Sequence, residues 1–360
     1  MLGIGIVGLP NVGKSTLFNA ITCSSIEAAN YPFCTIEPNM GIVTLNDERL
    51  KKVAAISSSQ NVLYAPVKFV DIAGLVKGAS KGEGLGNKFL SHIREVTAIC
   101  QVLRCFEDEN VIHVEGTVNP IRDIEIINEE LILSDLEVAT KALDKQQKLS
   151  KGDNKEAKAL IPILEKAKNH LDEMKLLNSL KLSDQELEFI KVYQFLTLKP
   201  MILVANVKEN ELNGNDLTAK VKEYAKENNL PMIIISSQLE YEISRLEERE
   251  REEFLKEYGL EESCLSVLIK ESYKLLDLIN FFTSGPKETR AWTVKKGSTA
   301  FESAAEIHTD IQKGFIRAEV TSYDDFINTQ GKAKEKGLMR LEGKDYIVKD
   351  ADVIYFRFNV

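Results

Sequence analysis

The stretch Gly8-Leu9-Pro10-Asn11-Val12-Gly13-Lys14-Ser15 decides the fold. It fits the pattern G-x-x-x-x-G-K-[ST], and it lies between an apolar run at 2–8 and a helical pattern at 16–21. This strand–loop–helix context is the one in which the motif binds phosphate, because backbone N–H groups and a helix N-terminus supply positive potential. We therefore predict that Lys14 reaches the β- and γ-phosphates of a nucleotide and that the Ser15 hydroxyl binds Mg²⁺.

Further apolar runs predict the sheet around this loop. Several are continuous runs bounded by Gly, Pro or Asp, a pattern typical of strands covered on both faces in a parallel α/β sheet. Nearly a hundred residues separate the fourth run from the fifth, which is too long for one crossover helix and predicts an insertion. The expected strands are 2–8, 41–45, 67–72, 98–106, 200–205 and 232–236.

The insertion has helical periodicity. Asn119-Pro120 supplies an N-cap followed by Pro at the first helical position. A turn at 150–154 separates this first long helix from a second, and a short third helix follows, so an αα-hairpin is the simplest packing. From about 281 the pattern changes to alternating strands at 290–294, 315–320 and 353–358.

Composition limits the class of protein. A length of 360 residues favours two or three domains, and 44% hydrophobic with 28% charged residues is typical of a globular chain. No run approaches 18 uncharged apolar residues, so the sequence predicts no membrane span, and the N-terminus lacks the features of a signal peptide. The five cysteines are scattered without a CxxC pair, which favours reduced thiols and a cytoplasmic protein over zinc or disulfides.

Charge is distributed unevenly along the chain. The net charge is −9, but residues 281–360 carry 13 basic and 12 acidic residues, so the acidity belongs to the remainder. This argues against a protein whose whole surface is basic and binds naked nucleic acid, but it does not exclude local basic patches.

Three further signals follow in the order of a nucleotide switch. Thr35 lies in a loop before the second strand, where a hydroxyl can complete the Mg²⁺ shell. Asp71 closes the third strand and can hold Mg²⁺ through water, and the N–H of Gly74 is available to a γ-phosphate. The glycine-rich run at 78–86 favours a segment that rearranges with nucleotide state, against the plainer alternative of a loop without switching.

The base-recognition segment departs from the common pattern. Regulatory GTPases usually have Asn-Lys-x-Asp after the fifth strand, where the Asp accepts both guanine N–H donors. Here the segment is Asn206-Val207-Lys208-Glu209, so Val replaces Lys and the longer Glu replaces Asp. A carboxylate displaced by one methylene cannot hold the same bidentate pair, which predicts a preference for ATP over GTP. Ser236 follows the sixth strand, where such proteins often begin Ser-Ala-Lys.

Taken together, 8–15, 71–75 with 78–87, 206–209, 290–293 and 307–318 resemble the Obg-like ATPases of the YchF subfamily. The resemblance covers essentially the whole chain. It implies a Ras-like P-loop NTPase domain at 1–127 and 199–280, an inserted α-helical coiled-coil domain at 128–198, and a C-terminal β-grasp (TGS) domain at 281–360. It also implies ATP preference and association with ribosomes. The residues expected to contact the nucleotide are Asn11, Val12, Gly13, Lys14, Ser15, Thr16, Gly74, Asn206, Val207, Glu209 and Ser236, with Ser15, Thr35 and Asp71 at Mg²⁺.

Leu75 stands where most switch GTPases carry the Gln that orients the attacking water. Without that help, turnover is expected to be as slow as about 10⁻³–10⁻⁴ s⁻¹. The resemblance implies a catalytic role for His113, because a histidine at this position has been proposed as catalytic in the family; a surface histidine is the alternative. A K⁺ ion bound by Asn11 is a second way in which the missing Gln could be replaced. Arg94 and Arg104 are candidate arginine fingers that the sequence cannot place.

Two function classes stay open. The first is a Mg²⁺-dependent ATP hydrolase that docks on the ribosome, as a monomer, with rRNA contact through local basic patches such as Lys295-Lys296, Lys332-Lys334-Lys336 and Arg340. The second is a nucleotide-regulated interaction or stress-regulatory module in which hydrolysis is incidental. A small-molecule kinase fits poorly, because the base segment and the tail have no place in it.

Overall fold

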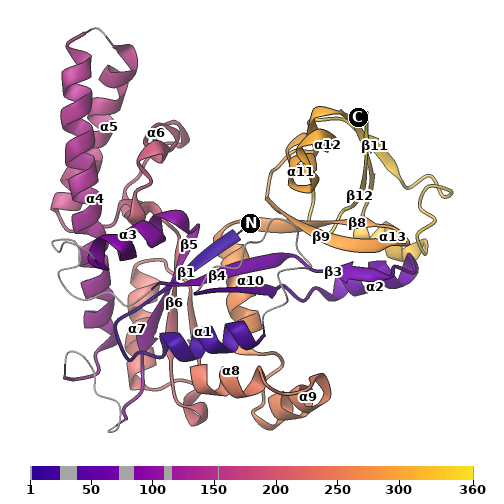
Figure 1. The fold of residues 1–360 in the computed structure, drawn as a ribbon, viewed down its shortest axis with the longest axis horizontal. Coiled ribbons are helices and arrows are strands. Elements are labelled where there is room, and N and C mark those ends of the chain that lie inside the picture. Colours follow the sequence, from indigo (N-terminus) through magenta and orange to yellow (C-terminus); the bar gives the residue numbers. More distant parts are fainter. Residues whose placement is uncertain (1, 25–38, 73–84, 109–115, 153, 360) are drawn as a thin grey trace. The chain divides into compact units, whose positions relative to one another are not determined.

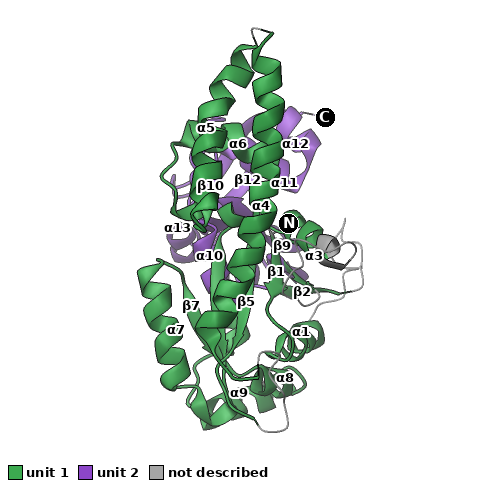
Figure 2. Cartoon of the chain, turned by 90° about the vertical axis from the view of Figure 1, so that its left-hand side faces the viewer, with its two compact units in different colours: residues 1–43, 68–267 green, residues 44–67, 268–360 purple. Residues whose placement is uncertain are grey.

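The computed structural model describes residues 2–24, 39–72, 85–108, 116–152 and 154–359. The chain divides into two compact units, shown in green and purple in Figure 2. The first comprises 1–43 and 68–267, and the second comprises 44–67 and 268–360. The second unit is therefore discontinuous in sequence. The three-part division expected from the sequence stays a prediction about domains.

The first unit is built on a six-stranded sheet in the order β2-β4-β1-β5-β6-β7. β1, β5, β6 and β7 are mutually parallel neighbours, and all side chains of β5 and β6 are buried, as continuous apolar runs predict. The six strand predictions are confirmed to within two residues. The strands are β1 (Leu2–Val7), β2 (Met40–Thr44), β4 (Pro66–Asp71), β5 (Ala98–Arg104), β6 (Met201–Asn206) and β7 (Met232–Ile235).

Helices flank this sheet, and the first of them follows the glycine-rich loop at 8–13. α1 (Lys14–Cys23) follows β1 directly and packs against α8 (Ser237–Ile243), so the ends of β1 and β7 lead into neighbouring helices. The unit also contains α3 (Leu85–Glu95), α7 (Asp216–Glu227), α9 (Glu248–Glu257) and the start of α10 (Cys264–Leu275). These elements and the parallel sheet confirm the P-loop α/β fold expected from the sequence.

The predicted helical insertion is present. Asn119 caps α4 (Pro120–Ser150) by accepting from the Arg122 backbone N–H at 3.2 Å, with Pro120 at the first position. Asn154 caps α5 (Lys155–Asp172) in the same way, and α4 and α5 run side by side to a shared turn (Figure 1). The short third helix is α6 (Asp184–Ile190), which begins with a capping box at Ser183. Buried leucine, isoleucine and alanine side chains hold the three together.

A buried carboxylate fastens the return of the insertion to α4. Asp135 is fully buried and accepts hydrogen bonds from the backbone N–H groups of Leu196 at 2.9 Å and Thr197 at 2.7 Å. The Thr197 hydroxyl donates a third at 2.7 Å. One side chain thus satisfies the otherwise unpaired donors at the start of a 3₁₀ turn, Leu196–Leu198.

The second unit is a mixed six-stranded sheet in the order β11-β10-β12-β8-β9-β3. Its apolar face packs against α11 (Ala300–Ile307), which gives the expected β-grasp type of fold. The sequence did not predict that β3 (Asn61–Leu63) and α2 (Glu48–Ile56) belong here: β3 pairs in parallel with β9. The remaining strands are β8 (Leu278–Ser284), β9 (Glu288–Lys295), β10 (Phe315–Thr321), β11 (Arg340–Glu342) and β12 (Val353–Phe358).

The described residues contain no helix of the length and apolarity needed to cross a membrane. They also contain no cluster of three or more His, Cys, Asp or Glu side chains arranged to hold a metal ion. Trp292 is partly buried against the core of the second unit, and its indole N–H donates to the Thr283 hydroxyl at 2.9 Å. The only tryptophan in the sequence is therefore a packing residue.

Candidate nucleotide-binding site

The phosphate loop runs from the end of β1 to the start of α1. Gly13 occupies the N-cap position of α1 with φ +100°, and no side chain caps the helix. The backbone N–H groups of the first turn are therefore available to an anion. A Cβ on Gly13 would lie 2.0 Å from the Asn206 Nδ2 atom, so only glycine fits at this position.

Lys14 and Asp71 form the charged centre of the site. The Lys14 ammonium is buried and donates to the Leu9 carbonyl at 2.8 Å, so the side chain folds back over its own loop. Burial lowers the pKa of Lys14, and the nearby Asp71 charge opposes that shift. Burial likewise raises the pKa of Asp71, and Lys14 opposes it. Burial therefore disfavours the charged form of both groups, and a phosphate bound at Lys14 or a cation bound at Asp71 would stabilise that form.

The donor set fits Mg²⁺. The Oδ1 atom of Asp71 is buried and has no hydrogen-bond partner among the described residues. Ser15 is exposed in the first turn of α1. A carboxylate oxygen and a hydroxyl are the hard oxygen ligands that Mg²⁺ takes beside nucleotide phosphates. The third expected ligand, Thr35, lies outside the described residues, as do Gly74, Leu75 and His113.

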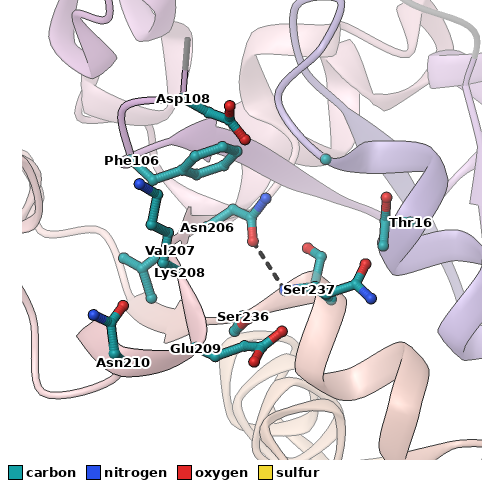
Figure 3. A pocket seen from close by; sticks show the side chains of 12 residues that line it. Thr16, Phe106, Asp108, Asn206, Val207, Lys208, Glu209, Asn210, Ser236 and Ser237 are labelled. Atoms are coloured by element: carbon teal, nitrogen blue, oxygen red, sulfur yellow. Dashed lines mark hydrogen bonds between the residues drawn. The ribbon is translucent and has the colours of Figure 1, made fainter. Parts of the chain in front are cut away.

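A cavity of about 540 Å³ adjoins the phosphate loop (Figure 3). This volume lies within the range of about 300–1,000 Å³ common for small-molecule sites. Three loops and the start of α1 enclose it, from the ends of β5, β6 and β7. Its lining residues are Gly13, Thr16, Phe106, Asp108, Asn206, Val207, Lys208, Glu209, Asn210, Ser236, Ser237 and Gln238.

Asn206 connects two walls of this cavity. Its Nδ2 donates to the Val12 carbonyl at 2.8 Å, and its Oδ1 accepts from the Ser237 N–H at 2.9 Å, the bond drawn in Figure 3. Asn206 is only 4% exposed. Its amide is thus engaged by the phosphate loop on one side and by the start of α8 on the other.

The other residues of the base-recognition segment lie close to Asn206 and its two hydrogen bonds. Val207 is buried, and its N–H donates to the Ile235 carbonyl at 2.8 Å, which fixes the segment against β7. Glu209 begins a 3₁₀ turn, Glu209–Glu211, and lines the cavity. Ser236 caps α8 by accepting from the Leu239 N–H at 3.3 Å.

Ser237 was not predicted from the sequence. Its hydroxyl is buried at the cavity, with no hydrogen-bond partner among the described residues. Sequence reasoning stopped at Ser236, one residue earlier. The signal that could have identified Ser237 is its place as the first residue of a helix that begins at the sheet edge.

The wall after β5 depends on a buried arginine. Arg104 is 1% exposed and donates to the Phe106 carbonyl at 3.1 Å and the Asp108 carbonyl at 3.2 Å. Its guanidinium also lies 4.7 Å from the Phe106 ring centroid. Arg104 thereby positions two cavity-lining residues. The second candidate finger, Arg94, donates to the Gln194 carbonyl and the Ser134 hydroxyl on the insertion.

Comparisons with known proteins agree along the whole chain. Residues 3–238 match the family model described as 50S ribosome-binding GTPase, and 278–359 match the YchF-GTPase C-terminal model, described as a protein of unknown function. The ribosome-binding ATPase YchF of Pasteurella multocida is 53% identical over 358 residues, covering 99% of both chains. The Bacillus subtilis protein of the same name is 51% identical over 364 residues, covering 100% of both. A solved structure of the Schizosaccharomyces pombe YchF GTPase superposes with a TM-score of 0.89 at 38% identity, covering 99% of this chain and 97% of that one.

Proposed function

Because this chain belongs to the YchF family of P-loop nucleotide hydrolases, we propose that it binds and hydrolyses ATP in preference to GTP and associates with the ribosome. The single observation that carries the nucleotide assignment is the 540 Å³ cavity beside the phosphate loop, with Val207 and Glu209 in its wall. The ribosome assignment rests on the relatives, which are named ribosome-binding ATPases.

Adenine suits this cavity better than guanine. Guanine presents two adjacent N–H donors, which an Asp at position 209 would accept in a bidentate pair. Glu209 is one methylene longer and begins a turn, and Val207 offers an aliphatic surface in place of a lysine stem. Phe106 adds an aromatic ring to the lining. A site that leaves polar groups of the wrong base unpaired rejects that base steeply.

The phosphate end supplies positive charge and a metal ligand set. The uncapped N-terminus of α1 and the Lys14 ammonium would face the β- and γ-phosphates, which would draw Lys14 from the Leu9 carbonyl. Ser15 and Asp71 would hold Mg²⁺, which neutralises phosphate charge when bound. K⁺ at Asn11 stays a prediction, and equal rates in K⁺ and Na⁺ buffers would count against it.

Titration of purified protein with ATP and GTP tests the nucleotide assignment. We expect tighter ATP binding, and tighter GTP binding would overturn the argument from Glu209. Single-turnover hydrolysis by a His113→Ala variant tests the catalytic prediction: a slower rate at unchanged affinity supports it, and an unchanged rate removes His113 from the mechanism.

Co-sedimentation with ribosomes tests the second half of the proposal. Wild-type protein is expected in the ribosomal pellet, with a fraction that differs between ATP, ADP and a non-hydrolysable analogue. A cytoplasmic, monomeric protein fits this role. Binding that ignores the nucleotide would favour an interaction module in which hydrolysis is incidental.

A further inference from the structure

The sheet of the second unit has an open face over β10, β11 and β12. Strand alternation directs Ala318, Val320, Ile354 and Phe356 into the core, so the intervening residues lie on the opposite face. That open face is defined here by Arg317 and Glu319 on β10, Leu341 on β11, and Tyr355 and Arg357 on β12. Apart from Glu319, these side chains are exposed.

The strand register arranges these five residues in two rows. Glu319 pairs with Leu341 on one side and with Tyr355 on the other, so it lies between two exposed apolar side chains. Tyr355 is 56% exposed and Leu341 is 58% exposed. Arg317 pairs directly with Arg357 in the next row. The open face therefore presents an aromatic ring beside a pair of guanidinium groups.

The charge on this face is positive and incompletely balanced. Arg357 holds Glu319 in a bidentate pair at 2.8 and 3.1 Å and stacks at 4.4 Å from the Tyr355 ring centroid. Arg317 is only 3.9 Å from the same carboxylate. The Arg357 hydrogen bonds lower the pKa of Glu319, and the charge of Lys334 acts in the same direction. One carboxylate thus lies within ion-pair distance of two guanidinium groups, and the charge of Lys334 acts on it as well.

Like charges directly opposite on neighbouring strands destabilise a sheet, and an anionic ligand would relieve that repulsion. Guanidinium groups bind phosphate in bidentate geometry, and an exposed tyrosine offers a stacking surface for an unpaired base. A protein–protein interface would need a larger apolar centre than Tyr355 and Leu341 supply on the open face. These features favour a single-stranded nucleic acid.

We propose that the open face binds a single-stranded RNA segment of the ribosome, with Tyr355 stacked on a base and Arg317 and Arg357 at flanking phosphates. The inference rests on the ribosome association proposed above and names the surface and the RNA chemistry involved. Because a base inside a duplex is already stacked, the face is expected to discriminate against double-stranded RNA.

The first test uses full-length protein and fluorescein-labelled 12-nucleotide oligo(U) and oligo(A), with a 12-base-pair duplex for comparison, followed by anisotropy. Tyr355→Ala is expected to weaken single-strand binding about 5- to 150-fold, and Tyr355→Phe is expected to keep it. Arg317→Gln should reduce the slope of log affinity against log salt by about 0.7. Preference for the duplex, or no binding by wild type, would overturn the proposal.

The matched control for Arg317 is Arg249→Gln on α9. Arg249 also lies 3.9 Å from a glutamate, Glu253, but belongs to the first unit. The control for the aromatic change is Phe189→Ala, another exposed ring outside the second unit. Both controls should bind oligonucleotide as wild type does; a loss equal to that of Tyr355→Ala would mean that binding is not localised to the open face.

Ribosome co-sedimentation over a range of salt separates the two proposals. If wild type sediments with ribosomes and Tyr355→Ala and Arg317→Gln are released at lower salt, the inference is supported. If the variants sediment like wild type at every salt concentration, the open face is not used, while the ribosome proposal stands. If wild type never sediments, the ribosome proposal fails. Variants that lose ribosomes although wild type binds no oligonucleotide would indicate a ribosomal protein as the partner and overturn the RNA assignment.

Discussion

Asn206→Ala tests whether the base segment and the phosphate loop form one unit. The substitution removes the donor to the Val12 carbonyl at 2.8 Å and the acceptor from the Ser237 N–H at 2.9 Å. Both backbone groups would be left without their partner in a region where Asn206 itself is 4% exposed. An unpaired buried polar group costs about 1–3 kcal/mol, so the free energy of unfolding should fall by about 2–4 kcal/mol, since the adjacent cavity admits water to part of the gap.

The effect on nucleotides distinguishes a structural tie from base reading. With both amide atoms engaged by the protein, Asn206 acts on ATP through the position of the phosphate loop. The affinities for ATP and GTP should therefore fall together, with their ratio unchanged. Each 1.4 kcal/mol of free energy needed to order the phosphate loop on binding lowers both affinities about tenfold. Urea unfolding and titration with both nucleotides measure the two quantities.

Asn228→Ala is the matched control for this variant. Asn228 is exposed, and its side-chain amide donates to the Tyr224 carbonyl at 2.9 Å near the end of α7. Its loss should cost less than about 0.5 kcal/mol, as is usual at the surface. The reasoning is refuted if Asn206→Ala is no less stable than this control, or if ATP affinity falls while GTP affinity does not.

Three further outcomes are expected. Gly13→Ala should abolish measurable ATP binding, because its Cβ would lie 2.0 Å from the Asn206 amide nitrogen at φ +100°; titration that gives wild-type affinity would contradict this. Asp135→Ala should lower the free energy of unfolding by about 2–5 kcal/mol in urea, since two backbone N–H groups and a hydroxyl lose their acceptor, and Asp135→Asn should recover part of it. In a Cys34→Ser background at pH 7.5, maleimide should label only the exposed Cys23 in native protein. Burial raises the pKa of the other three thiols to about 12, so their labelling should increase only as the pH rises toward that value. Fast labelling of these three thiols at pH 7.5 would contradict the prediction. Those three are Cys100, Cys105 and Cys264.

The sequence predicted the elements that depend on local pattern. The strand at 2–7, the glycine loop and α1 follow from residues adjacent in the chain, and the Asn119-Pro120 cap marks the start of α4 correctly. These features need no tertiary information, because capping and apolar periodicity act within a few residues.

The sequence could not predict features that depend on distant partners. β3 is three residues long and is recognisable as a strand only through its pairing with β9, more than two hundred residues later. Phe106 enters the candidate site because the buried Arg104 binds its carbonyl, and a charged residue ending an apolar strand gives no sign of that role. Likewise, the Asn206 amide bonds to the Val12 carbonyl and the Ser237 N–H, which lie far from it in the chain, so the sequence alone could not identify these partners.

The continuous course of α4 has a mechanical consequence. Its 31 residues make a rod about 46 Å long at 1.5 Å per residue. The first half packs against β5 and α7 of the first unit, where Asn128 donates to the Tyr224 hydroxyl, and the second half packs against α5. A tilt of about 5° at the middle of α4 would displace its far end by about 2 Å, because the outer half of the helix is about 23 Å long. A small change of angle beside the sheet would thus become, without any hinge, a displacement of the whole tip of the insertion.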